Sequence, residues 1–411
     1  MNSSSGWSEF RLSDQALQQI EEEFELQSGY VSIKAGIALC KHYLAINEIQ
    51  NARALCNTLL GTVPINWQLF VLTRDIAELA DDDMFFIEAC KKIRQSDPDY
   101  RAVHFPLGDH YSKSGDERKA LVIFREAIRL FLDSPRDLGR LSERLIKLDD
   151  YQSAWMAITA ALQLDPNNET YQYLRDFSLS GSPHFLHCLN RNDEVADFTP
   201  KRIFIGGCGR SGTWLCEQLF ACFDDCQRND TERHFGRFAY LPSGNNLHVL
   251  KRMHNSHRTL EKLPHDIGLI YMIRHPFDVL VSEHLGKTNF ISFDNWMSEY
   301  KTYLQIKDRP NTVIVRYEEL VTNPNNFQRT LETTFSITPD IPITEFYKRA
   351  KPRKGVERAM QSLRPFDESS IGKHLSNQSN IDFCKKTLKT HPEIRKSIEN
   401  LRYEIDPRIG T

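Results

Sequence analysis

The amino-acid sequence predicts an α + α/β protein, in which a helical array precedes a parallel sheet covered by helices on both faces, a three-layer α/β/α arrangement. Two observations predict this fold class. The first half of the chain repeats with a period of 34 residues, and the second half alternates short β-rich runs with amphipathic segments. Because a chain of 411 residues is longer than a domain with one compact core usually is, we expect two domains. These are a helical domain over residues 1–190 and an α/β domain over residues 200–411.

Charge also separates the two halves. The net charge of −3 combines −10 over residues 1–200 with +7 over residues 201–411. A mildly basic half favours a small anionic ligand. The excess is too weak to indicate nucleic acid, so no nucleic-acid partner is expected.

The composition favours a cytoplasmic protein. No run of about 18 apolar residues occurs, so we expect no membrane span. The start, MNSSSGWSEFRLSDQ, lacks the apolar stretch of a secretory signal. The nine cysteines are an odd count, and in a reducing compartment we expect them to be free and mostly buried.

Several positions carry the 34-residue repeat. Two sets of residues recur every 34 positions, and each member of the second set lies seven residues after a member of the first. The first set is Ala52, Phe86, Ala120 and Ala154, and the second is Leu59, Ile93, Ala127 and Ala161. Small residues at fixed places let paired helices touch closely. The pattern resembles the tetratricopeptide repeat over about residues 33–168, which implies a superhelix whose concave surface accepts a peptide or protein partner. A plain helical bundle with accidental periodicity is the alternative.

Two positions depart from the repeat. Arg74 occupies a place where that family has a small residue, and Leu132 stands where a proline is expected. Pro64, at the end of the first repeat, fits the pattern, whereas Pro135 arrives late. We therefore expect the second helix of the third repeat to be extended.

The second half has the order of a parallel α/β sheet. Buried strands are expected at 202–206, 247–251, 268–274 and 312–317, with helices at 213–223, 276–286 and 293–307. The remainder, about 340–411, is expected to be helical and loop-like. Such sheets bind ligands beyond the carboxyl ends of their strands.

A glycine-rich turn, GGCGRSG, joins the first strand to its helix. Its glycines leave backbone N–H groups open to an anion, and the following helix N-terminus adds favourable charge. As a Walker A loop it lacks the lysine and magnesium ligand, because Thr213 and Trp214 stand in their places. As a dinucleotide fingerprint it lacks an apolar strand leading to Asp230 or Glu232.

The run Arg210-Ser211-Gly212-Thr213 resembles the 5′-phosphosulfate loop of sulfotransferases that use 3′-phosphoadenosine 5′-phosphosulfate (PAPS). The resemblance implies that the backbone from Gly209 to Trp214 holds the 5′-phosphosulfate. A basic side chain in the loop, Arg210, would then neutralise the leaving phosphate without a metal ion.

A second segment, YMIRHPFDVLVSEH, resembles the 3′-phosphate motif of the same family, which implies that Arg274 and Ser282 bind that phosphate. Pro276 is suited to the first helical position, so we expect Ser282 to lie two turns into the helix, on the face that Arg274 adjoins. The alternative is that Arg274 merely pairs with Asp278.

Two weaker matches extend the resemblance to about residues 200–378. VRYEELVTNP resembles a family segment that implies Tyr317 near the adenine, and RPFDESSIGKHLSN resembles one that implies Lys373 near the 3′-phosphate. Either residue could equally be an ordinary surface side chain.

Two residues are candidates for the base that deprotonates the acceptor. Glu232 lies where protein-tyrosine and repeat-bearing sulfotransferases have a glutamate. His254, near Lys251, resembles the Lys-Thr-His of the small-molecule enzymes, in which the lysine assists transfer, but one extra residue intervenes. We favour Glu232. Either could instead be a solvated loop residue.

The sequence thus predicts a PAPS-dependent sulfotransferase that releases adenosine 3′,5′-bisphosphate, needs no metal, and carries a tetratricopeptide array. A non-catalytic binding protein with a degenerate nucleotide fold is the rival hypothesis, and a P-loop kinase is a third. The acceptor and the oligomeric state stay open, because the loops over the sheet (233–246, 284–292 and 350–370) contain no motif that identifies a substrate.

Overall fold

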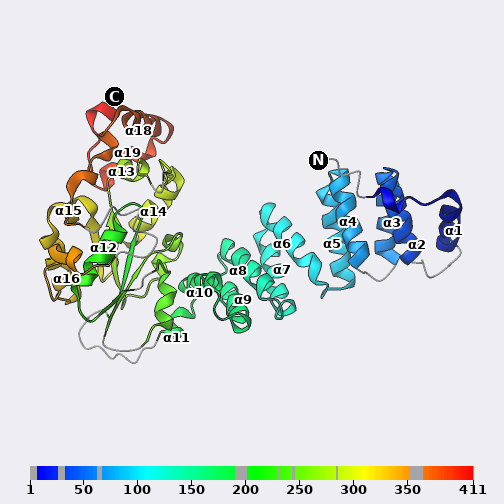
Figure 1. Cartoon of the computed structure of the whole chain (residues 1–411), viewed down its shortest axis with the longest axis horizontal. Helices are drawn as coiled ribbons and strands as arrows, with labels where there is room; N and C mark the ends of the chain where they lie inside the picture. Colours follow the sequence, from blue (N-terminus) through cyan, green and yellow to red (C-terminus); the bar gives the residue numbers. More distant parts are fainter. Residues whose placement is uncertain are drawn as a thin grey trace. The chain divides into compact units, whose positions relative to one another are not determined.

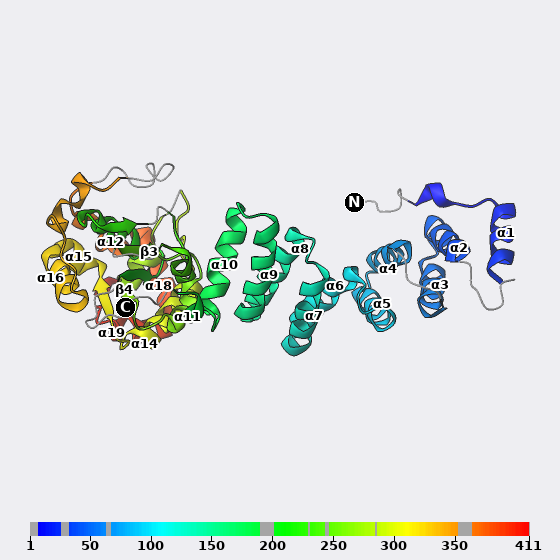
Figure 2. The same ribbon diagram turned by 90° about the horizontal axis from the view of Figure 1, so that it is seen from below.

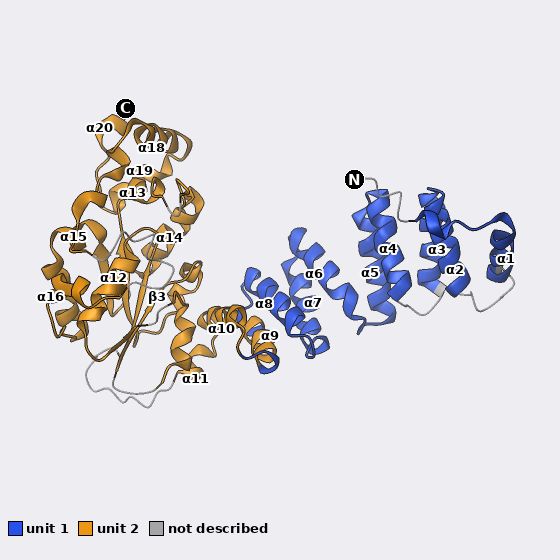
Figure 3. Cartoon of the chain, in the orientation of Figure 1, with its two compact units in different colours: residues 1–153, 163–166 blue, residues 154–162, 167–411 orange. Residues whose placement is uncertain are grey.

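The computed structural model of the chain describes residues 7–25, 33–62, 67–189, 201–228, 231–242, 246–283, 286–351 and 364–410. The chain forms two compact units (Figures 1 and 3). Residues 1–153 with 163–166 make up the first, which we call the helical unit. Residues 154–162 with 167–411 make up the second, the sheet unit, so helix α9 is divided between them.

The helical unit consists of helices joined by short turns, and each packs mainly on its neighbours in sequence (Figure 2). The repeat positions Leu59, Ile93 and Ala127 are fully buried in it, which confirms a helical N-terminal region. Its elements are η2 (Ser8–Phe10), α1 (Asp14–Glu25), α2 (Ile33–Ala45), α3 (Ile49–Thr62), α4 (Trp67–Ala80), α5 (Asp83–Ser96), η3 (Arg101–Val103), α6 (His104–Lys113), α7 (Glu117–Leu130) and α8 (Pro135–Lys147), followed by α9 (Tyr151–Leu164).

The expected extension of the third repeat is wrong. Helix α7 has 14 residues, the same length as α3 and α5. The late proline has another role, because Pro135 opens α8 and Ser134 caps that helix by accepting a hydrogen bond from the Asp137 N–H at 3.4 Å. The first-repeat proline, Pro64, lies outside the described residues.

The sheet unit contains five parallel strands in the order β2-β3-β1-β4-β5. They are β1 (Arg202–Gly207), β2 (Cys226–Arg228), β3 (Leu247–Lys251), β4 (Gly268–Ile273) and β5 (Thr312–Arg316). The four predicted strands are confirmed. Sequence analysis missed β2 because it is a polar edge strand of three residues, Cys-Gln-Arg.

Side chains alternate between two apolar layers. Ile203 and Ile270 belong to a cluster with side chains of α12, α15 and α16, whereas Phe204 and Tyr271 belong to a cluster with α14, α18 and α19. Helices therefore cover both faces of the sheet. The first layer contains α12 (Thr213–Leu219), η4 (Phe220–Cys222), α15 (Tyr317–Thr322), α16 (Pro324–Phe335) and η8 (Ile343–Lys348). The second contains α10 (Glu169–Gly181), α11 (Phe185–Cys188), η5 (Phe235–Tyr240), η7 (Leu260–Lys262), α13 (Pro276–Leu280), α14 (Phe293–Ile306), α18 (Gln378–Thr390), α19 (Glu393–Asn400) and α20 (Pro407–Gly410). The remaining short helices are η6 (Ser256–Arg258), η9 (Glu368–Ser370) and η10 (Lys373–Leu375).

Helix α10 belongs to the core of the sheet unit. It packs on η5 at Gly236, where an added Cβ would lie 2.1 Å from the Asp176 carbonyl oxygen and 2.9 Å from the Ser180 nitrogen. The compact sheet unit therefore begins earlier than the predicted boundary. The expected linker, residues 190–200, lies outside the described residues.

No described helix is both long enough and apolar enough to cross a membrane.

Candidate functional site

The loops that follow β1 and β4 diverge at the carboxyl edge of the sheet. From β1 the chain crosses to β2 at one edge, whereas from β4 it continues to β5 at the other. Strands β1 and β4 are neighbours, and a small crevice lined by Ser211 and Arg274 lies between the loops that follow them, at the point where open α/β sheets bind ligands. This crevice is the candidate site.

The glycine-rich turn lines one side of the crevice. Three of its residues have positive φ angles: Gly207 (126°), Arg210 (70°) and Gly212 (92°). A Cβ on Gly212 would lie 2.5 Å from Tyr317 Cδ2, so only glycine fits there. Within the described part of the chain, the N–H groups of Gly209, Arg210 and Gly212 donate no hydrogen bond, which leaves them for a ligand.

The remaining predicted loop residues are mostly covered. Ser211 is 2% exposed, and its N–H donates to the Cys208 carbonyl at 3.2 Å. Thr213, also buried, begins α12. The Trp214 indole N–H is buried without a partner among the described residues.

Arg274 follows β4 and is anchored by the protein on several sides. Its guanidinium donates to the Arg210 carbonyl at 3.1 Å and to the Ser370 carbonyl, and its Cζ lies 4.6 Å from the centroid of the Tyr317 ring. The expected alternative partner, Asp278, is also present at 3.6 Å. Arg274 is thus both a structural tie and the innermost cation of the crevice.

Two further cations lie near Arg274 and carry no counterion. In the described part of the chain, neither the Arg210 guanidinium nor the Lys373 ammonium makes an ion pair or a side-chain hydrogen bond. Partial desolvation and the nearby Arg274 charge lower the pKa of Arg210 from its ordinary value. Desolvation, Arg274 and Arg210 likewise lower the pKa of Lys373. Among the described residues two carboxylates act on these three cations, Asp278 and Asp367, and Asp367 is already paired with Arg364, so positive charge remains in excess.

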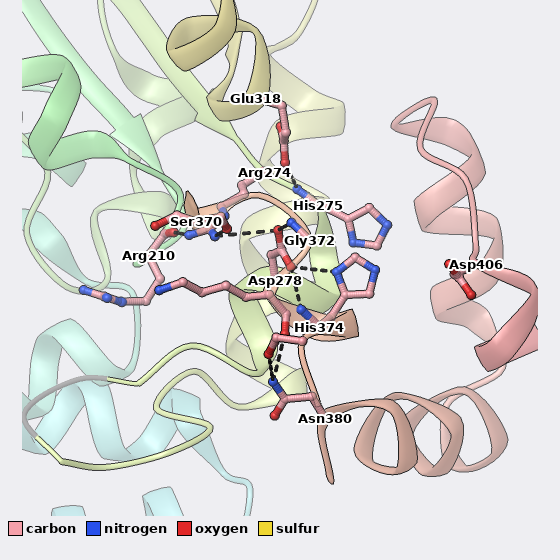
Figure 4. A network of polar contacts seen from close by, with 12 residues as sticks. Arg210, Arg274, His275, Asp278, Glu318, Ser370, Gly372, His374, Asn380 and Asp406 are labelled. Carbon is pink, nitrogen blue, oxygen red and sulfur yellow. Dashed lines mark hydrogen bonds and ion pairs between the residues drawn. The ribbon is translucent and has the colours of Figure 1, made fainter. Parts of the chain in front are cut away.

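Asp278 is fully buried between β4 and the C-terminal segment (Figure 4). Its carboxylate accepts hydrogen bonds from the Gly372 N–H at 2.9 Å, the His374 N–H at 2.9 Å and His374 Nδ1 at 2.6 Å. Burial raises the pKa of Asp278, but the hydrogen bonds from His374 and the Arg274 charge outweigh burial, so the pKa lies below its ordinary value.

His275 extends this network on the side away from the cations. Its ring stacks on that of His374 with centroids 4.3 Å apart, and its backbone N–H donates to Glu318 Oε1 at 2.9 Å. Burial and the His374 ring lower the pKa of His275 to about 4. The imidazole is therefore neutral, and its Nε2–H donates to the Glu404 carbonyl at 3.1 Å.

The expected position of Ser282 is wrong. Helix α13 ends at Leu280, so Ser282 lies beyond it and not two turns inside it. The Ser282 hydroxyl donates to the Val279 carbonyl at 2.7 Å. Contact with a phosphate there requires the hydroxyl to rotate away from this carbonyl.

The structure brings two of the catalytic candidates together. Lys251 Nζ lies 2.6 Å from Glu232 Oε1 at the end of β3, and the Arg233 N–H ties this loop to the Lys251 carbonyl at 2.9 Å. Lys251 is buried and Glu232 is half-exposed. His254 is exposed, and partial burial and Arg252 lower its pKa from the ordinary value.

Arg252 is a site residue that was not predicted from the sequence. Its Nη1 would lie 3.6 Å from a Cβ on Gly209, so it borders the glycine-rich turn. Arg252 Nη2 is 3.2 Å from Glu299 Oε1, and Tyr271 donates to the other oxygen of Glu299 at 3.1 Å. The available signal was its place next to Lys251 at a strand end.

No group of three or more histidine, cysteine or acidic residues in the described part of the chain is arranged to hold a metal ion. Scans against protein-family models and curated proteins found no match to this chain.

Proposed function

We propose that the sheet unit is a sulfotransferase that moves a sulfuryl group from PAPS to a hydroxyl or amine acceptor and releases adenosine 3′,5′-bisphosphate. One observation carries this proposal. Arg210, Arg274 and Lys373 gather at a crevice where open α/β sheets bind ligands, and they outnumber the carboxylates that act on them in the described part of the chain, Asp278 and the Arg364-paired Asp367. A nucleotide with phosphate groups at both ends matches that excess. We also assign the unit a fold like that of P-loop proteins.

Each residue of the crevice has a role in this proposal. The free N–H groups of Gly209, Arg210 and Gly212 bind the 5′-phosphosulfate, and Arg210 neutralises the phosphate as it leaves. Arg274 and Lys373 bind the 3′-phosphate, while Tyr317 covers the turn and borders the adenine. The helix α12 has only seven residues, so we assign the binding to the cations and the turn.

Glu232 is the favoured base, because it lies beside Lys251 at the end of β3. As the acceptor oxygen or nitrogen bonds to sulfur, the bond from sulfur to the bridging phosphate oxygen breaks. Its electron pair leaves with the bisphosphate, and the acceptor proton goes to the Glu232 carboxylate. Lys251 holds that carboxylate at 2.6 Å, and His254 is the alternative base.

Nucleotide binding provides the first test. Adenosine 3′,5′-bisphosphate should raise the melting temperature of the sheet unit, since a ligand at about 100 times its Kd stabilises by roughly 2.7 kcal/mol. ATP with magnesium should do so less, which separates the proposal from a kinase. The double variant R210A/R274A should lose the effect, whereas R395A, at an exposed position on α19, should retain it. Equal effects in both variants would refute the proposal.

Turnover provides the second test. Transfer of labelled sulfate from PAPS into an extract of the source cell should depend on Glu232, and E232Q should lower the rate by about 10²–10⁴-fold. H254N is the matched comparison. A larger loss in H254N than in E232Q would reassign the base.

The helical unit favours a second function, partner binding, on the basis of one groove of about 480 Å³. Phenylalanine, arginine and aspartate side chains line it together. Two of its arginines are ion-paired, Arg101 with Asp133 at 2.9 Å and Arg140 with Asp137 at 3.1 Å. We propose that this unit is a tetratricopeptide-like superhelix and that the groove binds a peptide whose aromatic side chains pack on Phe70 and Phe105 and whose carboxylates replace Asp133 and Asp137 as partners of Arg101 and Arg140. Fluorescence anisotropy with an acidic, aromatic peptide should show binding that R140A weakens and R118A, on α7, does not. No difference between these variants would refute the assignment.

A further inference from the structure

We propose that Asp278 is a positioning residue that holds Lys373 at the 3′-phosphate end of the crevice, so that the protein prefers nucleotides bearing a 3′-phosphate. This inference rests on the proposed function. It assigns to one buried carboxylate the task of completing the donor site with a segment from the far end of the chain.

The first step is the fit of the carboxylate to the segment Glu368–Leu375, which we call the C-terminal clamp. Asp278 Oδ2 accepts from the Gly372 N–H and Oδ1 from the His374 N–H, each at 2.9 Å. These two residues flank Lys373. One carboxylate therefore fixes the backbone on both sides of the lysine, at Gly372 and His374, and Figure 4 shows these two residues beside Asp278.

The two hydrogen bonds to Asp278 require a left-handed backbone conformation at Gly372. Gly372 has a φ of +72°, and a Cβ added there would meet no atom within 4 Å. Its left-handed backbone lets the N–H groups of Gly372 and His374 point toward one anion, as in the anion-binding turns known as nests. The anion is the Asp278 carboxylate itself, so the clamp closes on the protein before any nucleotide arrives.

The third step concerns the other supports of the clamp. Arg274 donates to the Ser370 carbonyl, and Asn380 Nδ2 on α18 donates to the Lys373 carbonyl at 2.9 Å. His374 is buried and stacked on His275. The backbone of residue 373 is held from both sides, whereas its ammonium group has no partner among the described residues.

Charge and position make opposite predictions for the substitution D278N. If Asp278 acted only as a nearby negative charge, removing the charge would strengthen the binding of an anionic nucleotide. If it positions Lys373, an amide nitrogen replaces one acceptor oxygen, the clamp loosens, and binding weakens. The sign of the change therefore separates the two roles.

The experiment compares two nucleotides by isothermal titration calorimetry on the full chain. D278N should weaken the affinity for adenosine 3′,5′-bisphosphate by about tenfold, the effect of one lost charge-assisted contact. The affinity for adenosine 5′-monophosphate should stay within about twofold of the wild-type value. K373M should do the same. The double variant should be no weaker than K373M alone, because both changes remove one contact.

A second variant covers the case in which D278N does not fold. G372A strains only the backbone of the clamp and should reproduce the nucleotide-specific loss. Its matched control is G115A in the helical unit, where φ is +80° and nothing lies within 4 Å of an added Cβ.

Three results would overturn the inference: stronger or unchanged bisphosphate binding in D278N, equal losses for both nucleotides, or no effect of K373M. In each of these the wild-type chain still binds the bisphosphate, so the proposed function survives. If the wild-type chain binds neither nucleotide, the proposed function fails and takes the inference with it.

Discussion

Gly236 offers the most direct test of the packing in the sheet unit. In G236A the new methyl carbon would lie 2.1 Å from the Asp176 carbonyl oxygen and 2.9 Å from the Ser180 nitrogen. Both atoms belong to the backbone of α10, so no side chain can rotate out of the way. Helix α10 or η5 must move by about 1 Å to restore contact distance, and overpacking of this kind costs about 1–3 kcal/mol of unfolding free energy.

Urea denaturation followed by tryptophan fluorescence measures this loss. In a W7F/W67F background the remaining tryptophans, Trp155, Trp214 and Trp296, all belong to the sheet unit.

The matched control for this experiment is G410A, because a Cβ on Gly410 makes only an ordinary contact of 3.8 Å with Ile405. G236A should unfold at a lower urea concentration than G410A, with a similar dependence on urea. Equal midpoints would show that α10 does not press on η5, and the assignment of this helix to the sheet unit would be refuted.

Three further predictions follow from burial. His275 has a pKa of about 4 in the folded chain, below the unfolded value near 6.5, so the free energy of unfolding should fall by about 3 kcal/mol as the pH drops from 6.5 to 4. Urea denaturation at several pH values should show a smaller fall in H275Q, and an unchanged dependence on pH would contradict the assignment. Burial raises the pKa of the Cys208 thiol, so iodoacetamide should label it at least about tenfold more slowly than the half-buried Cys188, as read by peptide mass spectrometry, and equal labelling would contradict the buried position. G108A places a methyl carbon 2.3 Å from the Phe124 ring and should lower the stability of the helical unit by about 1–3 kcal/mol in urea, whereas a neutral effect would mean that the ring can move aside.

Parts of the fold that depend on regular burial could be predicted from the sequence. Leu59, Ile93 and Ala127 recur every 34 residues because the same position of each helix faces the core. The strands β1 and β4 read as apolar runs because both of their faces are covered. Strand β2 has no apolar run, because it lies at the edge of the sheet and has a neighbouring strand on one side only.

The end of α13 and the role of Asp278 could not be predicted. Residues from Val279 to Ser282 are buried on either side of the helix end, so their polarity does not show where the helix stops. The hydrogen bond from Gly372 to Asp278 joins residues 94 positions apart, and no local pattern reports such a pair. Arg210 and Arg274 could be proposed from the sequence because each lies in a segment, after an apolar strand, that resembles a known phosphate-binding motif.

The central place of β1 affects how the chain matures during synthesis. The helices α2 to α7 contact their neighbours in sequence and can assemble as the chain emerges from the ribosome. By contrast, β1 pairs with β3 and β4, so Ile203 reaches its partners Val249 and Gly268 only after these later residues have been synthesised. The apolar side chains of β1 lack their native partners during that interval, and transiently exposed apolar surface of this kind promotes aggregation.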